Sequence, residues 1–316
     1  MSRPEKVTGD ATMVKRLVWH LETVLFILLS YSFAMVPCRV ALSLGSQLGR
    51  LAFRLMKRRR KIAIDNIEAS LPFLQAQDGW NPDCGTPEEL ARRTFENLGR
   101  SLVEDFRLYH GRGREIIDAV QFRGLEHYER ALARNKGVAF ITGHCGNWEL
   151  MALSFGARIH GLSVVARRQD NGYLNNVLEK IRSRYGNKVI YKSGALRAMI
   201  AEFRANRIVG MLIDQAVVPS EGVLVDFLGR SSWTTKLPTI ISRKTAVPLI
   251  PILIHREGGG HVITLYPEMH PDAEKDGDDG ARADMAILSG VIEDYIVRHP
   301  DEWYWIHKRW KRAPGS

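Results

Sequence analysis

The sequence predicts an α/β fold, with a mostly parallel sheet flanked by helices, preceded by an N-terminal membrane helix. Beyond residue 137, short apolar runs alternate with segments of helical periodicity, as in parallel sheets covered on both faces. Leu17 to Val36 is an almost entirely apolar stretch of about 20 residues, which is enough for a helix to cross a bilayer. Residues 1–61 carry +9 of the chain's formal charge of +10, and these charges bracket the apolar stretch, which indicates anionic lipid rather than nucleic acid as the partner.

We therefore divide the chain into a membrane-anchoring region, residues 1–61, and a main domain, residues 62–316. In the first region we expect a single span at about 17–36, although a buried core helix is the alternative. A second apolar helix, Val40 to Met56, ends in the basic run Lys57–Lys61, and we expect it to lie on the membrane face. More basic residues follow the span than precede it, which favours a cytoplasmic main domain.

The main domain begins with helical segments. An amphipathic helix is expected over 62–74, stopping near Pro72, and a second helix over 88–110, with a loop rich in Gly, Pro, Asn and Asp between them. The strands expected after these helices are 137–142, 162–166, 188–191, 208–213, 247–255 and 261–266. The helices expected among them are 147–160, 174–185, 196–205 and 284–298, and the acidic stretch Asp272–Asp279 is interpreted as a solvated loop.

Several kinds of site are excluded by the motifs that the sequence lacks. The three cysteines, Cys38, Cys84 and Cys145, are far apart and form no CxxC pair, so neither a disulfide framework nor a zinc site is expected and a reducing compartment is the default. GxSxG, HExxH, P-loop and GxGxxG motifs are absent, which removes the simplest serine-hydrolase, zinc-protease and nucleotide-binding interpretations.

The segment from Gly143 to Glu149 combines acid–base chemistry with a suitable position. It follows a buried strand and opens a helix, and ligand sites of α/β sheets form at such strand ends. A turn through Gly146 can bring His144 and Glu149 together, so that the carboxylate fixes the imidazole tautomer. The other ring nitrogen can then take a proton from a substrate hydroxyl, and N–H groups at the helix start can stabilise an oxyanion.

Two alternatives remain for this segment. Cys145 is a rival nucleophile through its thiol, although adjacent side chains generally point away from each other. His144 can instead be purely structural, with Glu149 favoured at a helix start by the macrodipole.

HCGNWE, residues 144–149, is an H-x4-E motif and resembles that of the lysophospholipid acyltransferase superfamily. The order of further blocks resembles its lipid A biosynthesis (lauroyl/myristoyl) branch, over residues 15 to 312. These blocks are Lys57–Lys61 with the following IAIDNIEASLP, Arg167–Asn171, Asp214-Gln215 with GVLVDFLG and Thr234-Thr235, and Pro300–Lys311. The sequence departs from the family pattern at Arg168, where the family usually has Pro.

The resemblance implies an O-acyltransferase that moves a fatty acyl chain from a thioester, usually of acyl carrier protein, to a hydroxyl of a lipid A precursor. It implies His144 as the general base oriented by Glu149, without metal or other cofactor, at the cytoplasmic side of the inner membrane. The expected partners are acyl carrier protein, a glycolipid acceptor and membrane lipid, and no nucleic acid is expected. The substrate-binding residues expected are Arg167, Arg168, Asn147, Asp214 and Gln215.

Structural roles are the alternative for three of these residues: Asn147 at the turn or helix start, and Asp214 and Gln215 in capping and loop bonding. His307 and Arg309 of the closing block either face lipid phosphates or fasten the end of the chain. Alternative functions are the same chemistry on another acceptor, such as a phosphatidylinositol mannoside or an aminoacyl lipid, a thioesterase, and a lipid-binding protein with an inactive site.

Overall fold

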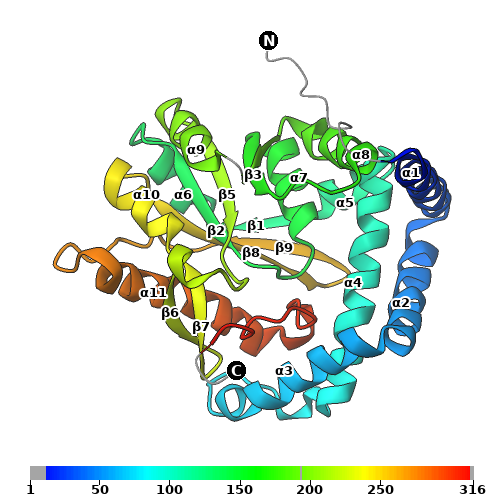
Figure 1. The fold of residues 1–316 in the computed structure, drawn as a ribbon, viewed down its shortest axis with the longest axis horizontal. Helices are drawn as coiled ribbons and strands as arrows, with labels where there is room; N and C mark the ends of the chain where they lie inside the picture. The colour runs from blue at the N-terminus through cyan, green and yellow to red at the C-terminus, as the bar shows by residue number, and fades with distance from the viewer. Residues whose placement is uncertain (1–11, 193, 314–316) are drawn as a thin grey trace.

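A seven-stranded sheet forms the centre of the computed structural model, which describes residues 12–192 and 194–313 (Figure 1). The strand order is β1-β9-β8-β2-β5-β3-β4, and all neighbouring pairs are parallel except β8 with β9. Helices flank the sheet, so the fold class predicted from the sequence is confirmed. Residues 1–11 of the proposed anchoring region lie outside the described residues.

The bounds of the elements are as follows. The strands of the sheet are β1 (Gln121–Arg123), β2 (Val138–Thr142), β3 (Leu162–Ala166), β4 (Lys188–Tyr191), β5 (Ile208–Leu212), β8 (Leu249–Glu257) and β9 (Gly260–Leu265), and a separate antiparallel hairpin joins β6 (Gly222–Phe227) to β7 (Arg230–Thr235). The helices are α1 (Met13–Met35), α2 (Cys38–Leu55), α3 (Lys57–Gln75), α4 (Pro87–Tyr109), α5 (Arg114–Ala119), α6 (Leu125–Leu132), α7 (Trp148–Arg158), α8 (Gly172–Arg182), α9 (Ala195–Arg204), α10 (Leu237–Thr245) and α11 (Gly277–Arg298).

Strand β2 shows how the sheet divides the core into two halves. Its alternate side chains point to opposite faces: Val138 and Phe140 pack with residues of α5, α6 and α7, whereas Ala139 and Ile141 pack with residues of α9, α10 and α11. All five residues of β2 are buried, because a parallel strand in mid-sheet is covered on both faces.

Most predicted boundaries agree with these elements, and the two main disagreements are at α11 and α3. The helix α11 begins at Gly277 rather than at Asp284, so the end of the acidic stretch Asp272–Asp279, interpreted as a loop, is helical. The other disagreement is α3. We expected this helix over 62–74, stopping near Pro72, but it begins at Lys57 inside the basic run and continues through Pro72 to Gln75. Pro72 has no N–H to donate to the Glu68 carbonyl, so the helix loses that bond and continues for only three more residues. The elements β1, α5, α6, α10 and the β6–β7 hairpin were not predicted.

The helix α1 buries small and polar side chains and exposes its large apolar ones, the reverse of a helix in a soluble protein. Its buried residues are Thr23, Ser30 and Ala34, while leucines such as Leu21 and Leu28 are exposed. Among the described residues it is the one helix long and apolar enough to cross a membrane, by length and composition. It packs against α4 and α8 at the edge of the molecule, and α2 continues along α4 (Figure 1).

Helices α2 and α4 approach each other closely through glycines. A Cβ atom added at Gly49 would lie 2.2 Å from the Phe95 carbonyl oxygen, and one at Gly99 would lie 2.1 Å from that of Gly45. Only glycine permits this spacing. The opposite side of α2 exposes apolar side chains, including Val40, Leu44, Leu48, Leu51 and Leu55, so its apolar surface continues that of α1.

Candidate active site

The candidate site lies at the carboxyl end of β2, beside that of β5. The two strands pair in parallel with Thr142 opposite Leu212. His144 and Asp214 each stand two residues beyond this pair, so the register brings them to the same level of the sheet edge. Residues from separate strand ends thus converge where ligands of α/β sheets bind.

Asp214 holds His144 through two bonds. Its Oδ1 lies 2.8 Å from His144 Nδ1, and its Oδ2 accepts the His144 backbone N–H at 2.8 Å. Trp303 Nε1 donates to Oδ2 at 2.9 Å. Burial opposes ionisation of this carboxyl group, but the His144 imidazole and the donated hydrogen bonds outweigh it and lower the pKa of Asp214 to about 2. The aspartate is therefore ionised at neutral pH.

Gln215 occupies the other side of the same imidazole. Its side-chain nitrogen lies 3.1 Å from His144 Nε2. Because a carboxylate only accepts hydrogen bonds and the amide nitrogen only donates them, the contacts assign the proton of the neutral ring to Nδ1 and a lone pair to Nε2. This is the tautomer that a general base needs on its substrate-facing nitrogen.

Glu149 is not the partner of His144, contrary to our expectation. It accepts from Arg182 Nε at 3.1 Å, in an ion pair that joins the start of α7 to the end of α8. Both ring nitrogens of His144 are occupied by Asp214 and Gln215. The short sequence spacing suggested the wrong carboxylate, because the parallel register brings Asp214 to the imidazole instead.

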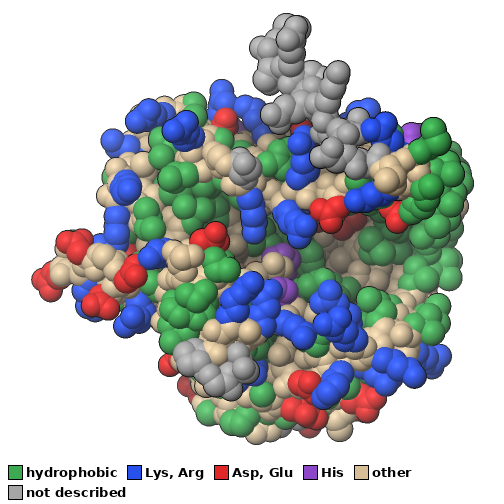
Figure 2. Space-filling model, in the orientation of Figure 1, with side chains coloured by type: hydrophobic (Ala, Val, Ile, Leu, Met, Phe, Trp, Pro, Cys, Tyr) green, Lys and Arg blue, Asp and Glu red, His purple; other side chains and the backbone are tan. Residues whose placement is uncertain are grey.

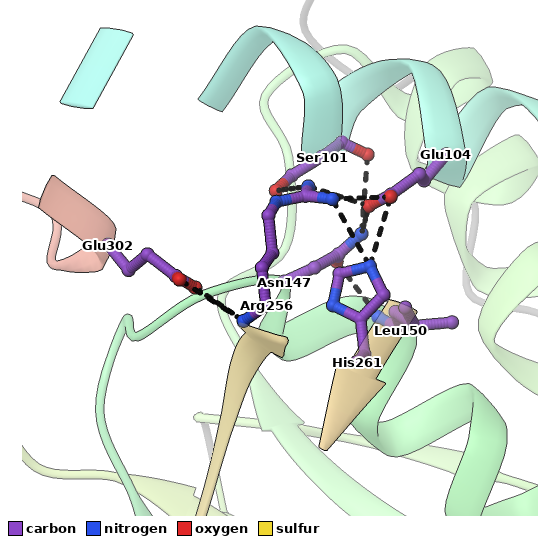
Figure 3. Close-up of polar contacts among 7 residues, drawn as sticks. All are labelled: Ser101, Glu104, Asn147, Leu150, Arg256, His261 and Glu302. Carbon is purple, nitrogen blue, oxygen red and sulfur yellow. Dashed lines mark hydrogen bonds and ion pairs between the residues drawn. The ribbon is translucent and has the colours of Figure 1, made fainter. Parts of the chain in front are cut away.

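Asn147 was expected at the substrate, but the structure places it in the interior. It is 1% exposed, and its Oδ1 accepts from the Leu150 N–H at 3.0 Å, capping α7. Its Nδ2 donates to Glu104 on α4 at 3.0 Å (Figure 3). With both side-chain groups engaged, Asn147 shapes the turn after His144, which was the alternative that we considered.

A buried ion cluster surrounds this Asn147–Glu104 contact (Figure 3). Arg256 at the end of β8 donates to both Glu104 oxygens, at 2.6 and 2.8 Å, and His261 Nε2 lies 3.0 Å from the same carboxylate. Burial opposes ionisation of Glu104, but Arg256 and His261 prevail and hold its pKa far below the usual range. The turn that bears His144 is therefore attached, through this cluster, to α4 and to the β8–β9 hairpin.

The C-terminal segment holds the turn from its other side. The Glu302 carbonyl accepts from the Gly146 N–H at 2.7 Å, and the Tyr304 N–H donates to the His144 carbonyl at 3.1 Å. Gly146 has φ +53°, and a Cβ there would lie 2.2 Å from the Ile254 oxygen. Arg309 is fully buried and donates to the Trp233 carbonyl at 3.1 Å, so it fastens the segment to β7.

Arg167 and Arg168 follow β3 at the same edge of the sheet, but they are not brought to the imidazole. Arg167 is 76% exposed and pairs with Asp170 at 3.2 Å, while Arg168 lies over the Tyr191 ring at 5.0 Å. Their role toward substrate stays a prediction.

Cys145 is not placed to act as the nucleophile. It is 1% exposed, and burial, with Asp214 and Glu302 nearby, raises the pKa of its thiol well above the usual value. Among the described residues, no group of three or more His, Cys, Asp or Glu side chains is placed to hold a metal ion.

Aromatic rings enclose the imidazole on its accessible side. Trp148 meets His144 edge-on with ring centroids 5.0 Å apart, and Tyr304 lies 5.7 Å away. The His144 side chain keeps 19% of its surface exposed. Figure 2 shows histidine side chains at the centre of this face beside a hollow, with hydrophobic side chains in its wall and Lys and Arg side chains at its rim. The arrangement suits a base acting on a substrate with apolar and anionic parts.

Sequence reasoning missed Trp148, Trp303, Tyr304 and Arg182 as neighbours of the site, and the Glu104–Arg256–His261 cluster as its support. Trp303 and Tyr304 lie in the closing block, so the block pointed to them without giving a role. Buried ion partners on separate elements carry no local spacing signal.

Comparisons of the sequence with known proteins identify the family of the chain. The model of the family described as bacterial lipid A biosynthesis acyltransferase matches residues 12–312. The chain is 28% identical over 285 residues to the lipid A biosynthesis lauroyltransferase of Escherichia coli, covering 88% of each chain. It is 26% identical over 240 residues to the phosphatidylinositol mannoside acyltransferase of Mycobacterium tuberculosis, covering 72% of each. The chain belongs to the bacterial lipid A biosynthesis acyltransferase family and is an enzyme that transfers acyl groups.

Proposed function

We propose that this enzyme transfers a fatty acyl chain from an acyl-carrier-protein thioester to a hydroxyl of a lipid A precursor, with His144 as the general base and Asp214 as the residue that orients it. The observation that carries the mechanism is the 2.8 Å contact of His144 Nδ1 with Asp214, which leaves Nε2 as the proton acceptor. Gln215, 3.1 Å from Nε2, marks the place where the acceptor hydroxyl would donate.

In the proposed reaction the acceptor hydroxyl gives its proton to His144 Nε2 as its oxygen attacks the thioester carbonyl carbon. The ionised Asp214 stabilises the imidazolium that forms. Collapse of the tetrahedral intermediate breaks the C–S bond, and the imidazolium returns the proton to the leaving thiolate. The products are an ester on the acceptor and the free thiol of the carrier.

The N-terminal turn of α7 is the proposed site of oxyanion stabilisation. The first N–H groups of a helix have no intrahelical partners, and they lie at the positive end of its dipole. In α7 the Leu150 N–H is capped by Asn147 Oδ1, so the groups proposed for this role are the N–H groups of Trp148 and Glu149. Trp148, the first residue of α7, contacts the imidazole, so these groups lie beside the base. We propose that Glu149 acts through its pair with Arg182, holding this turn in place, rather than by orienting His144.

The names of the relatives support the proposed acceptor. The lauroyltransferase relative and a myristoyltransferase of Escherichia coli, 23% identical over 289 residues, are named for lipid A biosynthesis, which supports a lipid A precursor as acceptor. A phosphatidylinositol mannoside is the second candidate, because the mycobacterial relative acts on it by name. In both cases the acceptor is a glycolipid.

The outer surfaces of α1 and α2 support a membrane location. Soluble proteins bury leucine, whereas α1 buries Thr23 and Ser30 and exposes its leucines. We propose that these two helices hold the enzyme at the cytoplasmic face of the inner membrane. A glycolipid leaves a bilayer only at about 0.8 kcal/mol per methylene, so the enzyme must meet it there.

The test is a transfer assay with membrane fractions. Labelled acyl-carrier-protein thioesters are offered with a Kdo-bearing lipid A precursor or with a phosphatidylinositol mannoside, using wild type and His144→Ala. We expect transfer to the lipid A precursor by wild type alone. Transfer only to the mannoside would replace the acceptor, and transfer by a folded His144→Ala variant would overturn the mechanism. Release of free fatty acid without acceptor ester would indicate a thioesterase.

A further inference from the structure

A basic pocket lies where the first turn of α3 meets the C-terminal segment. Its volume is about 270 Å³. The residues lining this basic pocket are Arg58, Arg59, Ile62, His307, Lys308 and Lys311.

The charges of the basic pocket are uncompensated. None of the described residues lining it is acidic, and in the part of the chain that the structure describes its four Lys and Arg residues form no ion pair. By contrast, Lys61, one turn further along α3, is paired with Asp65 at 2.8 Å. Four like charges around one concave surface repel each other unless an anion lies among them.

The walls of the basic pocket are fixed to each other. Arg59 donates to the Ile306 carbonyl at 3.1 Å. The Asn66 side-chain amide donates to the carbonyls of Trp305 and His307 at 2.8 and 2.9 Å. Because the segment cannot move away from α3 without breaking these bonds, the two backbone segments that carry the cationic side chains keep a fixed position relative to each other, which lowers the entropy cost of binding a ligand.

The basic pocket also lies close to the catalytic base. The His307 N–H donates to the Tyr304 carbonyl at 3.3 Å, and the Tyr304 ring lies 5.7 Å from that of His144. Lys and Arg side chains gather beside the central histidines in Figure 2. One substrate molecule can therefore reach both places.

We propose that the basic pocket binds a phosphate group of one of the transferase's own substrates, an inference that rests on the proposed function. A phosphate offers several acceptor oxygens with up to two negative charges, which matches guanidinium and ammonium donors around a small concave surface. Two sources supply this chemistry: a phosphate on the glycolipid acceptor, or the phosphodiester of the pantetheine arm that carries the acyl thioester.

The test is the double variant Arg58→Gln/Lys308→Gln, because both side chains line the basic pocket and neither forms a hydrogen bond or ion pair with another residue that the structure describes. The control is Lys57→Gln/Arg312→Gln, which removes the same charge from exposed neighbours outside it. We expect KM for one substrate to rise about tenfold or more in the test variant, with kcat unchanged, as for loss of uniform binding. In the control we expect less than a twofold change.

Two further arms identify the source. An acceptor lacking its phosphate should remove the KM difference if the acceptor supplies the group, and a pantetheine thioester lacking the phosphodiester should remove it if the donor does. Equal KM values in test and control variants, for both substrates, would overturn the inference.

A separate binding measurement keeps this inference distinct from the proposed function. If wild type transfers to no acceptor, the proposed function fails. Anion binding by the basic pocket is then tested by measuring the Tm of each protein with and without inorganic phosphate. A rise in Tm for wild type and control but not for Arg58→Gln/Lys308→Gln supports an anion site, and no selective rise overturns it.

Discussion

His144 Nδ1 and Asp214 Oδ1 lie 2.8 Å apart although 70 residues separate them in the chain. The contact exists because β2 and β5 are parallel neighbours in register. Two residues past the Thr142–Leu212 pair, one strand supplies a base and the other supplies the carboxylate that orients it. The dyad is thus a product of sheet topology rather than of a local motif.

We predict that Asp214→Asn lowers kcat by roughly 10³–10⁴-fold, the effect of losing the correct imidazole tautomer in such dyads. The amide can donate to Nδ1 and so leave the proton on Nε2. The measurement is single-turnover transfer with saturating donor and acceptor. The exposed Asp226→Asn variant is the control, and activity near wild type in a folded Asp214→Asn protein would contradict the dyad.

We predict that Glu149→Gln and Arg182→Gln have similar effects, each lowering kcat about a hundredfold, because each releases the start of α7 and misplaces the site. If the two side chains act only as a pair, the double variant should be no worse than either single variant. The measurement is kcat for all four proteins. A strong effect of Glu149→Gln alone, with Arg182→Gln near wild type, would instead indicate that the glutamate acts directly on a reacting group.

The elements of the sheet could be predicted from the sequence because their signal is local. The strands β3 and β4 were predicted with the observed bounds, Leu162–Ala166 and Lys188–Tyr191, since each is a short apolar run between turn residues. The β6–β7 hairpin was not predicted, because its residues Ser231, Ser232 and Thr234 give little apolar signal.

The base could be predicted from the sequence but its partner could not. His144 was identified because it follows a buried strand within a dense motif. Asp214 was expected at the site only as a substrate-binding residue. The order of strands is set by packing of distant segments, so the sequence did not indicate that Asp214 would bond to the imidazole while Glu149 paired with Arg182. For the same reason the cluster of Glu104, on α4, with a partner on β8 was invisible before the fold was known.

We predict that Arg256→Met destabilises the protein by about 3–5 kcal/mol, the usual cost of leaving one member of a buried ion pair without its partner. Glu104, 3% exposed, would keep only His261 and Asn147. Adding Glu104→Gln should recover most of this loss, because the buried charge is then removed as well. The measurement is denaturant unfolding of detergent-solubilised protein, and equal stability of wild type and Arg256→Met would contradict the prediction.

We predict that the stability of the protein depends on pH between about pH 4.5 and 7 because of Glu302. Burial raises the pKa of its carboxyl group from 4.5 to about 7, against the opposing hydrogen bond and charge of Arg256. The folded protein therefore holds this proton more tightly than the unfolded chain. The contribution of protonated Glu302 to the free energy of unfolding is fully present below pH 4.5. It is lost as the pH rises through 7, by about 3 kcal/mol in total.

In Glu302→Gln the group no longer titrates, so the difference in unfolding free energy between the variant and wild type should increase by that amount from pH 4.5 to 8. The measurement is denaturant unfolding of both proteins across this range, and subtracting one curve from the other cancels the other titrating groups. The Glu302 carboxyl group accepts the Arg256 N–H, and the Glu302 backbone carbonyl accepts the Gly146 N–H. Deprotonation of the Glu302 carboxyl group therefore places a buried charge beside the turn that positions His144. A pH-independent difference between the two proteins would show that Glu302 keeps its ordinary pKa and that this turn is insensitive to pH.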